Sequence, residues 1–248
     1  MRKKCIIFNL SFNELKKKNR NNGQDHVARL TKPWIDYRMS IFMKYTCKSF
    51  KAQTNQDFIA LIKYDPQSDK HIQESLNQYD KLPANIQFIK AEEFDDHVAE
   101  HAIGSDFLYL VRLDSDDMYH RTFVQQLHDA VPKEKTLVLI CSKGYKYDCT
   151  NQLLSIDPRK SPPFYTLIYK TEEYLKGVRY LLKGGHPGAI KLPHEYMPKQ
   201  NYVYIIHNRN IRGTFNQDKV IEDNPEKIKR LLKRFTKKQK AKQDHTIF

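Results

Sequence analysis

The chain has 248 residues, 40% of them hydrophobic and 12% aromatic, which is enough to bury the core of one α/β domain. Its formal net charge of +14 indicates an anionic partner such as a nucleotide, an acidic lipid surface or a nucleic acid. The first apolar run, Cys5-Ile6-Ile7-Phe8, stops at Asn9 and is too short for a signal sequence or a membrane span. Four cysteines without paired spacing are typical of a reducing compartment, so we expect a cytoplasmic protein.

The amino-terminal half of the chain alternates short apolar runs with stretches of helical spacing. From Pro33 to Tyr45 the apolar side chains recur at helical intervals, and Pro33 falls in the first turn, where its missing N–H is harmless. Strands alternating with helices predict an α/β fold with a mostly parallel central sheet flanked by helices. Strands are expected at 5–8, 58–65, 86–89 and 107–111, and helices at 33–45 and 92–102.

The carboxyl-terminal half continues this alternation less regularly. A helix is expected at 121–131, and apolar strand-like segments at 136–141, 164–169 and 202–206. Asn224-Pro225-Glu226 has the signature of a helix start, and the following apolar residues share one helix face. We therefore expect one domain over 1–223, with halves 1–120 and 121–223, and then a basic amphipathic helix and tail over 224–248.

Carboxylates follow two of the expected strands. Asp65 ends the run at 58–65, and Arg-Leu-Asp-Ser-Asp-Asp at 112–117 follows the run at 107–111. In a parallel sheet these strand ends share one edge, which is where ligands bind. Asp114 and Asp116, at alternate positions, can converge on one hard cation such as Mg²⁺ or Mn²⁺. In the alternative interpretation, Asp116 and Asp117 only turn the chain and cap the next helix.

Other phosphate-binding devices are missing from the sequence. No glycine-rich fingerprint follows the first strand and no Walker lysine is found, so a metal and basic side chains would have to handle phosphates. Arg112 either orients a phosphate or serves only as the ion-pair partner of the neighbouring carboxylates, and the sequence leaves both roles open.

Three segments taken together resemble a known group of enzymes. The segments are Trp34-Ile35-x-x-Arg38-x-x-Ile41-Phe42, Ser49-Phe50-x-x-Gln53-Thr54-x-Gln56-Asp57-Phe58 and Arg112-Leu113-Asp114-Ser115-Asp116-Asp117. In this order and spacing they resemble the rhamnosyltransferase-like family of bacterial GT-A glycosyltransferases and, more distantly, the family 2 inverting glycosyltransferases. The resemblance covers residues 5–120, whereas 148–200 match poorly, so the acceptor side stays open.

The resemblance implies a Rossmann-like GT-A fold and a metal-dependent activity. A sugar would pass from a UDP-, dTDP- or GDP-linked donor to a glycan or to a lipid-linked or cell-surface polymer precursor, with inversion, and Mn²⁺ or Mg²⁺ would be the cofactor. Asn9 and Asp65 would lie at the nucleotide base, and Arg112 and Asp114 would also bind the nucleotide sugar. The implied metal ligands are Asp114, Asp116, Asp117 and His207. Replacing Asp116 by Ala is expected to abolish transfer and to leave the fold intact.

Such a reaction needs a general base for the acceptor hydroxyl. Glu195 is the candidate base because it lies between two expected strands in the second half, although it equally suits an exposed loop. Asp157 and Glu172 are reserve candidates.

The basic carboxyl-terminal segment can be interpreted in two ways. Residues 225–243 either lie as an amphipathic helix on the anionic inner face of the cell membrane or pack their apolar face on the domain.

A metal-dependent nucleotidyltransferase is the main alternative function. A nucleic-acid-binding protein is the third, which the charge and the fifteen Tyr and thirteen Phe residues favour without any recognisable binding motif.

Overall fold

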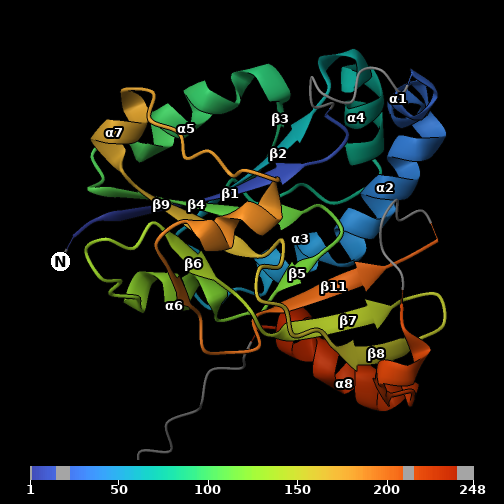
Figure 1. The fold of residues 1–248 in the computed structure, drawn as a ribbon. Helices are drawn as coiled ribbons and strands as arrows, with labels where there is room; N and C mark the ends of the chain where they lie inside the picture. The colour runs from blue at the N-terminus through green and yellow to red at the C-terminus, as the bar shows by residue number, and fades with distance from the viewer. Residues whose placement is uncertain (1, 15–22, 209–214, 239–248) are drawn as a thin grey trace, which may run out of the picture.

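The computed structural model describes residues 2–14, 23–208 and 215–238. Within them the chain forms a seven-stranded central sheet with helices on both faces, and a smaller five-stranded sheet that the last helix covers (Figure 1). No helix in these ranges is long and apolar enough to cross a bilayer. The predicted α/β fold with a largely parallel central sheet is confirmed.

The central sheet is built around its first strand. The strand β1 (Lys4–Ser11) lies between β2 (Ile59–Tyr64) and β4 (Phe107–Asp114), parallel to both. The strand order is β10-β6-β9-β4-β1-β2-β3, and only β9 runs against its neighbours. The remaining strands are β3 (Ile86–Lys90), β6 (Val138–Ile140), β9 (Tyr165–Lys170) and β10 (His194–Tyr196).

Both faces of β1 are buried, which explains its nearly continuous apolar sequence. Phe8 and Leu10 face one core, where the Phe8 ring meets Phe50 and Phe58 edge-on at centroid distances of 4.9 and 5.3 Å. Ile7 faces the opposite core. One face of the sheet is covered by α5 and α7, and the other by α2, α3 and α6 (Figure 1).

Several helices match the sequence-based predictions, while others were not expected. Pro33 lies in the first turn of α2, as predicted, and the helix expected at 92–102 begins at Phe94 after a short 3-10 turn. The helices are α1 (Gly23–Leu30), α2 (Lys32–Lys44), α3 (Thr46–Lys51), α4 (Asp69–Leu76), α5 (Phe94–Ala102), α6 (Phe123–Asp129), α7 (Thr171–Leu175) and α8 (Pro225–Thr236).

The second sheet has the strand order β12-β8-β7-β11-β5. Of its strands only β11 was expected from the sequence. They are β5 (Met118–Tyr119), β7 (Gly144–Asp148), β8 (Leu153–Ile156), β11 (Tyr202–Ile206) and β12 (Val220–Glu222). The chain enters this sheet directly from β4, so the run of aspartates lies at the junction between the two sheets.

Stacked aromatic rings pack the second sheet against the core below the central sheet. The ring of Tyr202 stacks on Phe164 at 3.9 Å, and the ring of Tyr119 stacks on Phe123 at 3.8 Å. Gly144 lies opposite Tyr202 in the parallel β7–β11 pair, and a side chain at this position would collide with the Tyr202 ring. The glycine therefore permits the close approach that holds β11 at the junction.

The carboxyl-terminal helix packs on the second sheet. Asn224 caps α8 by accepting hydrogen bonds from the backbone N–H groups of Glu226 and Lys227. Ile228 and Phe235 are buried against β7 and β11, and Leu231 and Leu232 pack beside them. The apolar face of α8 therefore packs on the domain, which was one of the two alternatives for residues 225–243. Residues 239–243 lie outside the described part.

Candidate functional site

The carboxyl ends of three adjacent parallel strands form one edge of the central sheet. Ser11, at the end of β1, pairs with Lys63 of β2 on one side and with Asp114 of β4 on the other. Asp65 follows β2 directly, so Asp65 and Asp114 flank the end of β1. Since neighbouring strands lie about 4.8 Å apart, the backbones of β2 and β4 are separated by roughly 10 Å across the sheet. We refer to this region as the carboxylate edge.

Asp116 is the most heavily contacted member of the aspartate run. It is only 5% exposed, and its Oδ2 atom lies 2.8 Å from Arg38 Nη1 and 3.2 Å from His207 Nε2. Burial disfavours the carboxylate form, but Arg38 and His207 outweigh it and lower the pKa of Asp116 to about 2. The turn after β4, helix α2 and the end of β11 therefore converge on one charged group.

Arg38 is the residue that the sequence reasoning missed. Its Nε and Nη2 atoms donate to Ser115 Oγ at 3.1 and 2.9 Å, in addition to the contact with Asp116. The signal was present in the sequence, because Arg38 stands in the helical series with Ile35 and Phe42, on a face that is otherwise apolar. A charged residue at such a position has to find a partner in the interior.

Tyr37, the residue before Arg38 on α2, contacts His207 and Asn208. Tyr37 donates a hydrogen bond of 2.6 Å to Asn208 Oδ1, and its hydroxyl lies 3.2 Å from His207 Nδ1. The two rings meet edge-on with centroids 5.8 Å apart. The structure thus brings His207 to Asp116, as the sequence suggested, and holds it between Asp116 and Tyr37. Asn210, which follows two positions after Asn208, lies outside the described residues.

Asp117 is turned away from the open edge. It is fully buried, and its Oδ1 atom accepts a 2.8 Å hydrogen bond from the backbone N–H of Ile205 in β11. Its Oδ2 atom has no hydrogen-bond partner among the described residues. Burial, and after it the charges of Asp116 and Asp114, raise the pKa of Asp117 well above its usual range. Asp117 therefore ties the turn after β4 to the second sheet, and its role as a metal ligand stays a prediction.

Asp114 is the most open carboxylate of the run. Its side chain is 37% exposed, and both of its oxygens accept from Arg112 Nη2, at 2.9 and 3.0 Å. Arg112 also donates to the carbonyl oxygen of Pro163 at 2.5 Å. The structure shows Arg112 in an ion pair with Asp114, and its role in orienting a phosphate stays a prediction.

The side chains at this edge do not form a metal site in the arrangement described. Asp116 is paired with Arg38, and Asp114 with Arg112, so both candidate carboxylates already have guanidinium partners. In the described ranges no group of three or more His, Cys, Asp or Glu side chains is placed to hold a metal ion. A divalent cation at Asp114 and Asp116 would compete with these ion pairs, and we derive no step through a metal.

Beside the end of β2, Asn13 contacts Asp65, and the predicted role of Asn9 at the nucleotide base stays a prediction. Asn9 lies inside β1, beside Leu61 and Arg112. Asn13 lies beyond the strand, where its Oδ1 accepts from the backbone N–H of Asp65 at 2.9 Å and its Nδ2 donates to Ser68 at 2.9 Å. The Asp65 carboxylate accepts from the backbone N–H of Gln67 at 3.0 Å and so caps the following turn.

Glu195 does not lie at the carboxylate edge. It is part of β10, which is three strands from β4 in the sheet order. Its Oε1 atom accepts from the backbone N–H of Lys133 at 2.8 Å and from the Thr136 hydroxyl, and both groups precede β6. Those contacts place the carboxylate toward the opposite edge of the sheet, so the expected base is not brought to Asp114.

The two reserve candidates are also engaged elsewhere. Asp157 accepts from Arg159 Nε at 2.9 Å and from the Tyr202 hydroxyl, beside the second sheet. Glu172 is exposed and pairs with Lys176 at 3.7 Å. We therefore assign no general base among these three carboxylates.

Comparison with known proteins adds a family to this geometry. Residues 8–166 match the model of the family described as "Putative rhamnosyl transferase". The chain belongs to this family. The matched region contains the second half of β1, the whole of α2 and the aspartate run, and it ends before Glu195 and His207. No match is found among curated proteins.

Several solved structures are similar in fold at low sequence identity. Residues 1–349 of S. aureus TarS in complex with UDP-GlcNAc are 12% identical, with a TM-score of 0.47, over 93% of this chain. The chain spans 65% of that TarS chain. A cytidylyltransferase from Leptospira borgpetersenii is 12% identical with a TM-score of 0.41, covering 81% of this chain and 78% of the other. A putative nucleotide-diphospho-sugar transferase from Desulfovibrio desulfuricans is 16% identical with a TM-score of 0.33, covering 83% and 82%.

Proposed function

We propose that this protein transfers a glycosyl unit, rhamnosyl in the first instance, from a nucleoside-diphosphate sugar to a hydroxyl acceptor. The observation that carries the proposal is the family match over residues 8–166, which includes the strands that bring Asp65 and Asp114 to one sheet edge. Ligands of open α/β sheets bind at this edge.

The donor would lie across the end of β1. Asn13 and Asp65 would contact the nucleoside, because they are held together beyond β1 and β2. Asp114 would contact the ribose or the diphosphate region, since it is the accessible carboxylate of the run. Arg112, which already binds Asp114, would be the nearest guanidinium to the departing phosphate, where positive charge stabilises the leaving group.

Asp116, Arg38 and His207 would position this edge rather than contact the donor. Their mutual hydrogen bonds fix the turn that carries Asp114. Dependence on Mn²⁺ or Mg²⁺ and inversion at the anomeric carbon remain predictions of the family resemblance. The acceptor would be a glycan or a lipid-linked precursor. Because the apolar face of α8 packs on the domain, contact with an anionic membrane would be made by the exposed basic side chains of the segment after residue 225.

The experiment is a product analysis with UDP-, dTDP- and GDP-linked rhamnose and related sugars. A glycosyltransferase releases the nucleoside diphosphate, whereas a nucleotidyltransferase joins a nucleotide to a phosphate acceptor and releases pyrophosphate. Quantifying both products by anion-exchange chromatography separates the two functions in one assay. Release of nucleoside diphosphate supports the proposal, and release of pyrophosphate alone from a nucleoside triphosphate and a sugar phosphate overturns it.

A further inference from the structure

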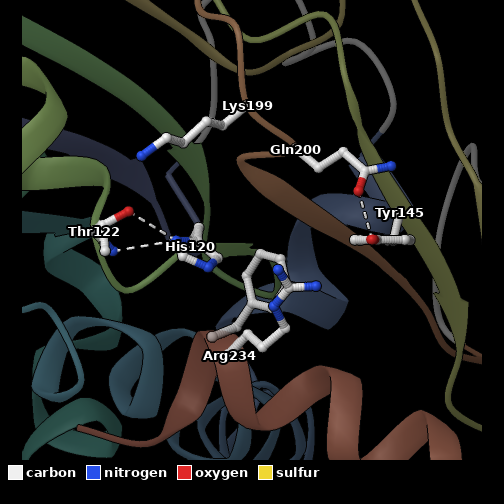
Figure 2. A pocket seen from close by; sticks show the side chains of 7 residues that line it. His120, Thr122, Tyr145, Lys199, Gln200 and Arg234 are labelled. Carbon is white, nitrogen blue, oxygen red and sulfur yellow. Dashed lines mark hydrogen bonds between the residues drawn. The ribbon is translucent and has the colours of Figure 1, made fainter. Parts of the chain in front are cut away.

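A second charged region lies at the other end of the paired strands β5 and β11. At one end of this pair Asp117 is bonded to Ile205, and at the other the backbone N–H of His120 donates to the carbonyl oxygen of Asn201 at 2.8 Å. Beside His120 is a cavity of about 330 Å³ (Figure 2). None of the residues that line it belongs to the carboxylate edge, so a ligand in this cavity would be independent of the proposed function.

The cavity is lined by basic and aromatic side chains. Lys199 lies above His120 and Arg234 below it in the view of Figure 2. The rings of Tyr145 and Phe235 form the apolar part of the lining, and the Phe235 ring meets the His120 ring edge-on at 5.3 Å. We refer to this region as the basic pocket.

The positive charge of the basic pocket is not compensated within the described ranges of the chain. No acidic side chain pairs with Lys199, Arg234 or the neighbouring Arg121 there, and the buried Arg121 Nε atom has no hydrogen-bond partner. Burial, followed by the charges of Arg234 and Arg121, lowers the pKa of His120 to about 4. Such an excess of cations around a cavity attracts an anion.

His120 is oriented to donate into this space. Its Nδ1 atom accepts from the backbone N–H of Thr122 at 3.3 Å and lies 2.9 Å from the Thr122 hydroxyl. In the neutral ring the proton is then on Nε2, which becomes a donor. The imidazole, the Lys199 ammonium and the Arg234 guanidinium together supply donors of the kind that bind phosphate oxygens.

We propose that the basic pocket binds the phosphate group of a phosphate ester, with Lys199, Arg234 and His120 as its ligands and Tyr145 and Phe235 against the organic part. The cavity is larger than a bare phosphate requires, and its aromatic wall favours an ester over the inorganic ion. The ester is either a soluble metabolite or the headgroup of a phospholipid, because the two share this chemistry.

The test measures phosphate-ester binding in the absence of any nucleotide sugar, so its outcome is independent of the glycosyltransferase proposal. Glycerol 1-phosphate is titrated into the full chain by calorimetry, and the His120 side chain is followed by NMR at constant pH. The pocket variant is Lys199→Gln with Arg234→Gln. The control is Arg230→Gln with Lys233→Gln, which removes the same charge from exposed positions outside the pocket.

We expect the wild-type protein to bind with a shift of the His120 resonance, the pocket variant to lose at least tenfold in affinity, and the control to stay within twofold. Equal losses in both variants, or an unmoved His120 resonance, would overturn the site. A second arm uses phosphatidylglycerol vesicles in phosphatidylcholine. Loss of co-sedimentation in the pocket variant alone identifies a headgroup, and equal co-sedimentation of both variants identifies a soluble ester.

Discussion

The two ends of the β5–β11 pair carry charge in opposite ways. At the carboxylate edge Asp116 is buried and paired with Arg38 and His207, and Asp114 is paired with Arg112. At the basic pocket Lys199 and Arg234 are exposed and have no acidic partner among the described residues. Buried charges must be paired because desolvation of a single ion is costly. Exposed charges are solvated by water and can stay unpaired until a ligand binds. The first region is therefore organised by the fold itself, and the second by what it binds.

The largest expected effect comes from removing the central carboxylate. Asp116→Ala leaves Arg38 and His207 without their shared partner in the interior, and we expect it to lower the free energy of unfolding by about 3–5 kcal/mol. The sequence-based expectation that this variant keeps an intact fold is revised by the burial of Asp116. Denaturant unfolding checks the value, and a loss of less than about 1 kcal/mol would mean that the ion pair contributes little.

The adjacent carboxylate should behave differently. In Asp117→Asn the amide oxygen can still accept from the N–H of Ile205, while the repulsion from Asp116 and Asp114 disappears. We expect the free energy of unfolding at pH 7 to change by no more than about 1 kcal/mol, against about 2–3 kcal/mol lost in Asp116→Asn. Similar losses in the two asparagine variants would contradict the distinction between Asp116, which is held by ion pairs, and Asp117, which is held by a backbone hydrogen bond.

Metal binding at the carboxylate edge should compete with the arginine. In Arg38→Gln the Asp116 carboxylate and His207 lose their guanidinium neighbour, so we expect Mn²⁺ to bind at least about tenfold more tightly than to the wild type, or about 1.4 kcal/mol. Electron paramagnetic resonance of Mn²⁺ measures the free ion, and circular dichroism verifies that the variant is folded. Equal binding in the two proteins would show that Arg38 does not occupy the cation position.

The smallest effect concerns the basic pocket and pH. The pKa of His120 is about 4 in the folded protein, below the unfolded value of about 6.5, so its contribution to stability is complete above pH 6.5 and is lost as the pH falls toward 4. The melting temperature of His120→Gln should therefore fall less between pH 7 and pH 4.5 than that of the wild type. Glycerol 1-phosphate should reduce the loss in the wild type, and identical pH profiles for the two proteins would contradict the low pKa.

The first half of the fold could be predicted because its signals are local. The runs that form β1, β2 and β4 are apolar because both sheet faces are covered, and the carboxylates at their ends follow from the parallel order. Once the strands were placed, the common edge of Asp65 and Asp114 followed as well.

The second sheet could not be predicted in the same way. Residues 144–148 and 153–156 contain tyrosine, lysine and serine although most of them are buried, and they belong to a sheet assembled from distant segments. The pairing of Tyr202 with Gly144 on one side and with Tyr119 on the other leaves no periodic signal. For the same reason Glu195 was expected near the site, although β10 places it at the far end of the central sheet.

The most direct test of the central claim uses Asp114, the accessible carboxylate of the edge. Asp114→Asn keeps the size of the side chain at a position that is 37% exposed, so the fold should persist, and Glu195→Gln serves as the matched control outside the edge. With the nucleotide sugar that the wild type turns over, we expect release of nucleoside diphosphate to fall at least a hundredfold in Asp114→Asn and to stay within about threefold in Glu195→Gln. Full release by a folded Asp114→Asn protein would contradict the account and move the donor site away from the carboxylate edge.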